Sequence, residues 1–143
     1  MHKLWFSVFL FFVANSCSAQ DNALLGCWGD GTVVQYFADG SHRANASSKC
    51  SLQFSETQII SRCTSPQGES VATYSYQLTR TGIYQAAITS HNQRPDLVGN
   101  TREYAYQATP TKLTITTEPQ TSKPTPPSAA IRVVSESTRI TCQ

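Results

Sequence analysis

The stretch ATYSYQLTR, residues 72–80, alternates apolar with polar side chains. A period of two places the two sets on opposite faces of an extended strand, so Tyr74 and Tyr76 share one face with Ala72 and Leu78. The same pattern recurs in short runs bounded by Gly, Pro, Asn or Asp, whereas segments with a helical period are nearly absent. The chain is therefore predicted to be all-β.

Eight strands are expected, mostly at hairpin spacing. Their ranges are 32–37, 46–54, 57–64, 72–80, 83–89, 102–109, 112–117 and 131–142. An up-and-down meander of eight strands is predicted to close into an antiparallel β-barrel, because closure removes the exposed edges of an open sheet. A two-sheet sandwich is the alternative. In the last strand, Val134 and Ile140 lie out of phase with Ile131 and Val133, which predicts a bulge near 134–137.

Residues 1–19 have the pattern of a secretory signal peptide, with a basic start, an apolar run from Leu4 to Ala14 and small residues near the end. Cleavage after Ala19 leaves residues 20–143 as a single domain. Cleavage before Cys17 would instead leave a lipid anchor at that cysteine. The apolar run is too short for a stable membrane span. The protein is accordingly predicted to be periplasmic or secreted.

Either cleavage leaves four cysteines: Cys27, Cys50, Cys63 and Cys142. In an exported chain an even number of cysteines predicts disulfides, here two, and the count alone allows three pairings. A four-residue loop at 55–58 would set Phe54 opposite Ile59 and, on the same face, Cys50 opposite Cys63. Opposed residues have Cβ atoms about 4.5 to 5.5 Å apart, so a slight pinch of the strands would join them.

The segments LLGCW, TVVQYF and ADG resemble the opening of small lipocalin-like barrel domains of bacterial exported proteins, with an L-x-G-x-W motif, a first strand and a D-G turn. The matching residues are Leu24, Gly26, Trp28, Phe37, Asp39 and Gly40. In the lipocalin family, the tryptophan closes the barrel floor and an arginine of the last strand packs over it. The resemblance thus implies a buried Trp28 covered by Arg139. The chain is shorter than true lipocalins and lacks their TDY-like middle motif, so the fold is implied more strongly than a deep ligand cup.

A closed barrel of eight strands brings the first and last strands together. If Cys27 opposes Cys142 in an antiparallel pair, a disulfide joins the strands on the outside while Trp28 and Arg139 point inward. This link would close a loop of more than a hundred residues. We therefore expect Cys27–Cys142 as the second disulfide.

Several function classes lack a signal in the sequence. Basic residues are scattered singly in a chain of formal net charge +2, which does not indicate a nucleic-acid surface. There is no G-x-S-x-G motif, no C-x-x-C motif and no cluster of carboxylates, and His42 and His91 lie in turn-rich stretches. Neither catalysis nor a metal or other cofactor is predicted.

The six tyrosines are the candidate ligand-binding residues: Tyr36, Tyr74, Tyr76, Tyr84, Tyr104 and Tyr106. One interpretation is core packing, with the hydroxyls reaching the barrel rim or water. The other is a shallow cavity at the open end, in which rings grip a ligand and hydroxyls orient it. Its residues would be Tyr74, Tyr76, Tyr104 and Tyr106, which form two same-face pairs.

The leading hypothesis is an exported lipocalin-like barrel that binds a small, partly apolar molecule. Two alternatives stay open. One is a protein-binding module, such as an inhibitor or immunity-like partner of a secreted enzyme, using the loop at 90–101 or the proline-rich stretch at 118–130. The other is an envelope structural or accessory domain without a ligand.

Overall fold

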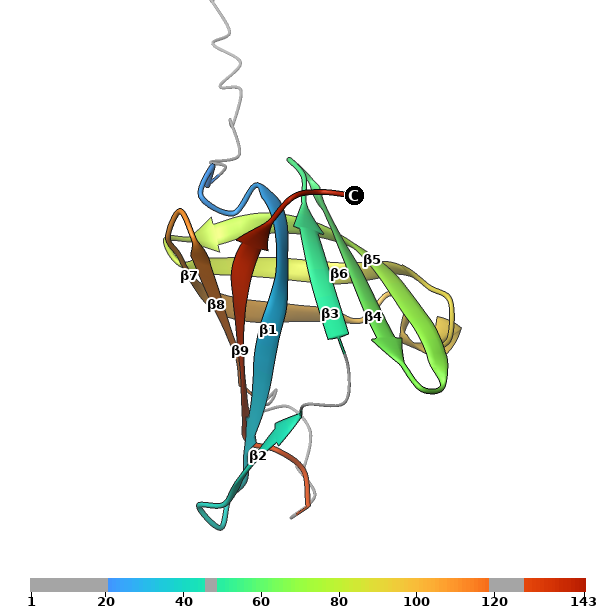
Figure 1. Ribbon diagram of the computed structural model, residues 1–143, viewed down its shortest axis with the longest axis vertical. Helices are drawn as coiled ribbons and strands as arrows, with labels where there is room; N and C mark the ends of the chain where they lie inside the picture. Colours follow the sequence, from blue (N-terminus) through green and yellow to red (C-terminus); the bar gives the residue numbers. More distant parts are fainter. Residues whose placement is uncertain (1–20, 46–48, 119–127) are drawn as a thin grey trace, which may run out of the picture.

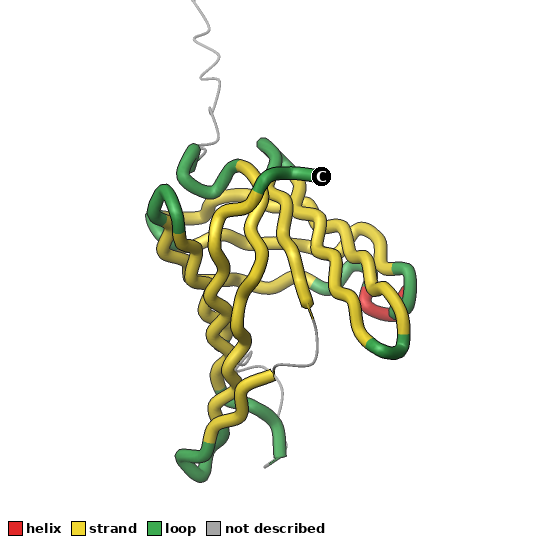
Figure 2. Tube along the Cα trace, viewed as in Figure 1, coloured by secondary structure: helices red, strands yellow, loops and turns green. Residues whose placement is uncertain are grey.

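The computed structural model describes residues 21–45, 49–118 and 128–143. The predicted leader, with Cys17, and residues 119–127 of the proline-rich stretch lie outside the described residues. The described part consists of nine β-strands and one single-turn 3-10 helix (Figure 2). The prediction of an all-β chain is confirmed for this part.

The strands follow the chain in order and are separated by short turns, except around the helical turn η1. Their bounds are β1 Gly26–Tyr36, β2 His42–Asn45, β3 Lys49–Phe54, β4 Gln58–Ser65, β5 Gly68–Arg80, β6 Ile83–His91, η1 Pro95–Leu97, β7 Thr101–Ala108, β8 Lys112–Thr117 and β9 Arg132–Ile140.

Eight of the strands form a closed antiparallel barrel. Each strand from β3 to β8 pairs with its successor, and β1 closes the ring by pairing with both β3 and β9. The short strand β2 pairs with the second half of β1, and this hairpin projects beyond the rest of the barrel (Figure 1, bottom). The barrel confirms the predicted fold and excludes the sandwich, whereas the sequence pattern did not reveal β2.

An extra residue in β1 changes which side chains face inward. Gly29 pairs with Thr138 but Thr32 pairs with Glu136, so three steps along β1 match two along β9. A Cβ on Gly31 would clash with the carbonyl oxygen of Glu136, so this close approach requires glycine. The predicted bulge at 134–137 is wrong, because β9 pairs with β8 without interruption and the irregularity belongs to β1.

Trp28 and Arg139 close one end of the barrel, called here the closed end. Trp28 is fully buried, and its indole Nε1 donates to the carbonyl oxygen of Leu24 at 2.9 Å. The Arg139 guanidinium lies 4.0 Å from the centroid of the Trp28 ring. It donates to the carbonyl oxygens of Leu25, Ala23 and Pro110 at 2.7, 3.0 and 2.8 Å. This geometry is the one that the lipocalin resemblance implies.

Two features of Gly26 explain why the L-x-G-x-W motif has glycine at its third position. Its φ of 111° lies in the region that side chains other than glycine rarely adopt. A Cβ there would also approach Arg139 Nη1 to 2.7 Å. The glycine therefore makes room for Arg139, which covers Trp28 two residues further along β1.

Both predicted disulfides are present. Cys50 pairs with Cys63 in the expected register, with Phe54 opposite Ile59 across the turn. Cys27 is joined to Cys142, but it lies opposite Ile140 rather than opposite its disulfide partner. The predicted register is thus wrong by two residues, and Trp28 lies directly opposite Arg139. The bond reaches past the end of β9 instead of joining an opposed pair.

Candidate functional site

The barrel interior contains a cavity next to the packed closed end. Its volume is about 170 Å³. Every strand from β3 to β9 contributes to its wall, which consists of Leu52, Ile59, Ser61, Tyr74, Tyr84, Ala86, Tyr104, Ile115, Thr117 and Ser135. These residues occupy alternate positions along their strands, as expected for one face of a curved sheet.

Two tyrosine rings form the most ordered part of the wall. Tyr84 and Tyr104 are opposite each other in β6 and β7, and their rings stack at 5.0 Å with an interplanar angle of 17°. Tyr84 is 3% exposed and Ile115 is 7% exposed, so much of the wall is well packed. Stacked rings lose little freedom when a ligand contacts them, which favours binding.

Three tyrosine hydroxyls in the cavity wall lack a partner among the residues that the structure describes. Within the described residues, the hydroxyls of Tyr74, Tyr84 and Tyr104 make no hydrogen bond to the protein. Every fully buried side-chain nitrogen or oxygen in that part has a partner, so each of these three oxygens keeps some accessible surface. They are available to donate to, or accept from, a bound molecule.

These hydroxyls are neutral at physiological pH. Burial raises the pKa of Tyr84 well above its ordinary value, and the neighbouring hydroxyls of Tyr104 and Tyr74 raise it further. Burial also raises the pKa of Tyr74, with a contribution from Tyr104. The cavity therefore presents apolar surface together with uncharged hydrogen-bonding groups.

Tyr76 and Tyr106, which the sequence placed in the same site, belong to the closed end. The Tyr76 hydroxyl donates to the carbonyl oxygen of Ser55 at 2.7 Å. The Tyr106 hydroxyl donates to the Asp21 carboxylate at 2.8 Å. Both rings pack against the buried core. The expected set of four tyrosines is thus divided into two cavity residues and two residues that fasten the closed end.

Tyr36 lies on the outside of the barrel, away from the cavity. It is paired with Arg132, whose guanidinium lies 4.4 Å from the centroid of its ring. The extra residue at Gly31 is the cause, because it reverses the alternation of β1 after Trp28. Without it, Tyr36 would share the inward face with Trp28.

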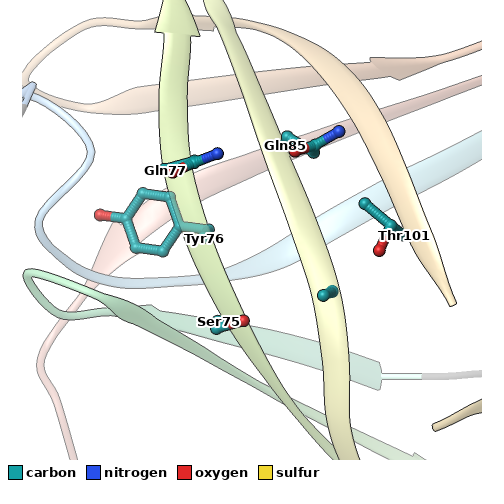
Figure 3. Close-up of a pocket in the computed structure, with 6 residues that line it drawn as sticks. Ser75, Tyr76, Gln77, Gln85 and Thr101 are labelled. Carbon is teal, nitrogen blue, oxygen red and sulfur yellow. The ribbon is translucent and has the colours of Figure 1, made fainter. Parts of the chain in front are cut away.

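A second hollow, of about 290 Å³, lies on the outer face of β5, β6 and β7 (Figure 3). It is lined by Ser75, Tyr76, Gln77, Gln85, Ala87 and Thr101. The Tyr76 ring and the Gln77 side chain leave β5 on opposite sides (Figure 3). Short Ala87 leaves space between longer polar side chains, and this hollow lacks the apolar wall of the inner cavity.

The loop between β6 and β7 makes contacts within itself and with the start of β5. Arg94 and Asp96 form an ion pair at 2.7 Å, and His91 Nδ1 accepts from the backbone N–H groups of Gln93 and Arg94 at 3.3 and 3.1 Å. Asn92 and Gln93 also donate to the carbonyl oxygen of Glu69.

The described residues contain neither a metal-binding cluster nor a helix able to span a membrane. No group of three or more His, Cys, Asp or Glu side chains in them is arranged to hold a metal ion. None of their helices has the length and apolar character needed to cross a membrane.

Sequence reasoning missed most of the apolar wall. Leu52 and Ile59 share the face of Cys50 and Cys63, and that alternation was a usable signal. Ala86 lies directly opposite Tyr76, so the β5–β6 hairpin register also indicated that Ala86 faces inward. Ser135 could not be found this way, because its inward position depends on how β9 pairs with β8 and β1.

Comparison with known proteins yields a fold but no family. No protein-family profile matches the sequence, and no curated protein is similar to it. A lipocalin-like protein from Bacteroides uniformis superposes with a TM-score of 0.56 at 13% identity, over 82% of this chain and 99% of that protein. A de novo designed fluorescence-activating β-barrel superposes with a TM-score of 0.43 at 14% identity, over 81% of this chain and 93% of its own. The chain therefore has a lipocalin-like fold, an eight-stranded closed barrel.

Proposed function

We propose that this protein binds a small, partly apolar molecule inside its barrel. The observation that carries the proposal is the cavity wall, which combines apolar side chains with three tyrosine hydroxyls that make no hydrogen bond to any described residue. Concave, largely apolar sites with a few polar groups are typical of small-molecule binding. The lipocalin-like fold agrees with such a role.

The size of the cavity limits the ligand. An apolar cavity of about 150 Å³ accepts benzene, and the cavity here measures about 170 Å³. The buried part of a ligand is therefore about the size of one six-membered ring or a short aliphatic chain. Any larger ligand would extend toward the barrel rim.

The wall also defines the chemistry of that ligand. Ile59, Ala86 and Ile115 supply apolar contacts, whereas the hydroxyls of Tyr74, Tyr84 and Tyr104 supply hydrogen bonds. A hydrocarbon would leave those hydroxyls unsatisfied, which costs about 1 to 3 kcal/mol per group when water is excluded. A ligand with both a ring or chain and a polar group fits better.

We also propose that the protein works outside the cytoplasm. The two disulfides agree with folding in an oxidising compartment. The apolar N-terminal segment agrees with export, as the sequence predicts. A binding barrel of this kind would meet its ligand in the periplasm or after secretion.

Native mass spectrometry of the protein purified from its own host tests the binding proposal. We expect a mass above that of the denatured chain, equal to one bound small molecule. Ala86→Leu fills the cavity from β6 and should abolish that added mass. Ala87→Leu, the next residue on the outer face, is the matched control and should retain it.

A fold defect in Ala86→Leu would be detected as a lost cooperative thermal transition. Ser61→Val, a smaller change in the opposite wall, then provides the second variant, and it should release or weaken the ligand while the barrel still melts cooperatively. The proposal is wrong if the added mass persists in folded Ala86→Leu and in Ser61→Val. Loss of the added mass in Ala87→Leu alone would assign binding to the outer hollow instead.

A further inference from the structure

Arg102 occupies an inward-facing position at the rim of the cavity. It lies opposite Ala86 in the β6–β7 register and two residues before Tyr104, and both of these neighbours line the cavity. Since alternate residues of a strand share a face, the Arg102 side chain belongs to the cavity side of β7. The residue is exposed, which places it at the rim rather than in the packed wall.

The guanidinium of Arg102 is available for a ligand. In the part of the chain that the structure describes, it has no hydrogen-bond or ion-pair partner. The other inward-facing arginine, Arg139, differs because its donors are occupied by three backbone carbonyls. The charge of Arg102 also reaches the wall: burial raises the pKa of Tyr104, and the arginine opposes that increase.

No carboxylate of strands β3 to β9 lies on the cavity face, and Glu118 follows the cavity residue Thr117 just beyond the end of β8. The glutamates of β5, β7 and β9 lie opposite the outward-facing residues Thr64, Gln85 and Thr114; they are Glu69, Glu103 and Glu136. Asp21 lies at the closed end, where it accepts from Tyr106. Across β3 to β9, the cavity face therefore carries cationic and neutral polar groups but no carboxylate.

We propose that Arg102 selects a carboxylate, so that the ligand class is a small organic acid with an apolar body. This inference rests on the proposed binding function of the cavity. The body fills the space between Ile59 and Ile115, and the carboxylate lies at the rim. There it accepts hydrogen bonds from the Arg102 guanidinium and from the neutral hydroxyl of Tyr104. Hydrogen bonds between a guanidinium and a carboxylate are about twice as strong as neutral ones.

Three probes of the same shape test the charge preference: 3-phenylpropanoate, 3-phenylpropanamide and 3-phenylpropylammonium. Each carries one ring, which matches the cavity, and a flexible arm that reaches the rim. Binding is followed by NMR titration of the backbone amides of Ala86 and Ile115 at low ionic strength, where charge interactions are least screened. We expect the acid to bind about tenfold more tightly than the amide, and the ammonium to bind most weakly.

Arg102→Gln should bring the affinity for the acid down to that for the amide, while the affinity for the amide changes less than about twofold. Arg80→Gln is the control, because Arg80 is an exposed arginine at the end of β5, and it should preserve the preference. Equal binding of acid and amide by the native protein would overturn the inference but leave the binding function intact. An equal loss of affinity for the acid and the amide in Arg102→Gln would likewise overturn the inference and leave the binding function intact. If none of the three probes shifts the cavity amides, both the inference and the proposed function at this cavity fail.

Discussion

The two halves of the barrel interior use the same residue type in different ways. At the closed end, the hydroxyls of Tyr76 and Tyr106 donate to Ser55 and Asp21, and the rings pack on the core. In the cavity half, the hydroxyls of the tyrosines have no partner in the described part of the chain. Position along a strand does not separate the two groups, because both face inward.

The partner of each hydroxyl separates a structural tyrosine from a site tyrosine. A buried hydroxyl that donates to a fixed carbonyl or carboxylate contributes to stability and is occupied. A hydroxyl that opens into a cavity contributes little to stability and is available to a ligand. Changes at the closed end should therefore alter the free energy of unfolding, and changes in the cavity half should alter binding.

Trp28→Ala should give the largest effect. It removes a fully buried ring together with the surface on which Arg139 lies, and changes of this type cost about 3 to 5 kcal/mol in unfolding free energy. Urea denaturation followed by circular dichroism measures this loss. A loss of unfolding free energy below about 1 kcal/mol would contradict this prediction and show that the closed end does not depend on its tryptophan.

The two disulfides allow a second comparison of the closed end with the cavity half. Cys27–Cys142 joins residues 115 apart near the closed end, whereas Cys50–Cys63 joins residues 13 apart on the inner face. The chain-entropy model assigns about 4.7 kcal/mol to a hundred-residue loop and about 3 kcal/mol to a fifteen-residue loop. The double change Cys27→Ser and Cys142→Ser should thus lower the melting temperature more than Cys50→Ser with Cys63→Ser. The reverse order would mean that native contacts, and not loop closure, determine the difference.

Alkaline pH should weaken the fold, and Tyr84 of the cavity half should account for part of the loss. Burial raises the pKa of Tyr84 above the 10.0 of a free tyrosine, so between pH 10 and that raised value the folded chain keeps a proton that the unfolded chain loses. The stabilisation is complete below pH 10 and is lost as the pH rises further, by about 1.4 kcal/mol per pH unit for one such group. Urea midpoints measured from pH 8 to 11 should fall above pH 10, and less steeply in Tyr84→Phe. Equal slopes in the two proteins would contradict this assignment.

Local patterns in the sequence were enough for eight of the nine described strands, the barrel and one complete register. The four-residue turn at 55–58 positioned Cys50 opposite Cys63, because hairpin pairing depends only on residues close in the chain. The alternation of residues 72–80 likewise put Tyr74 and Tyr76 on one face, which the structure places inside.

Features that depend on distant pairing were beyond this reasoning. The pairing of β1 with β9 contains the extra residue at Gly31, which moved Tyr36 outside, and its register sets Cys27 opposite Ile140 rather than Cys142. Asp21 accepts a hydrogen bond from the hydroxyl of Tyr106, which lies 85 residues away in the sequence. Nothing in the sequence near either residue indicates this contact. The sequence therefore predicted which tyrosines share a face but not which hydroxyls are free.

The smallest expected change in stability is also the sharpest test of the difference between the two halves. Tyr76→Phe with Tyr106→Phe removes two hydrogen bonds at the closed end, each worth about 1 kcal/mol. Tyr74→Phe with Tyr104→Phe removes hydroxyls that bind nothing in the described protein, so the free energy of unfolding should stay within about 0.5 kcal/mol of the native value.

Binding should show the opposite order. The cavity pair should lose affinity for 3-phenylpropanoate by about tenfold, because a ligand hydrogen bond is deleted without a change in ring volume. The closed-end pair should keep that affinity, since its hydroxyls do not face the ligand. Both variants retain all four rings, so packing is nearly constant and the hydroxyls are compared directly. If the cavity pair loses stability while the closed-end pair loses affinity, the assignment of the tyrosines to the two halves is reversed and the binding site lies at the other end of the barrel.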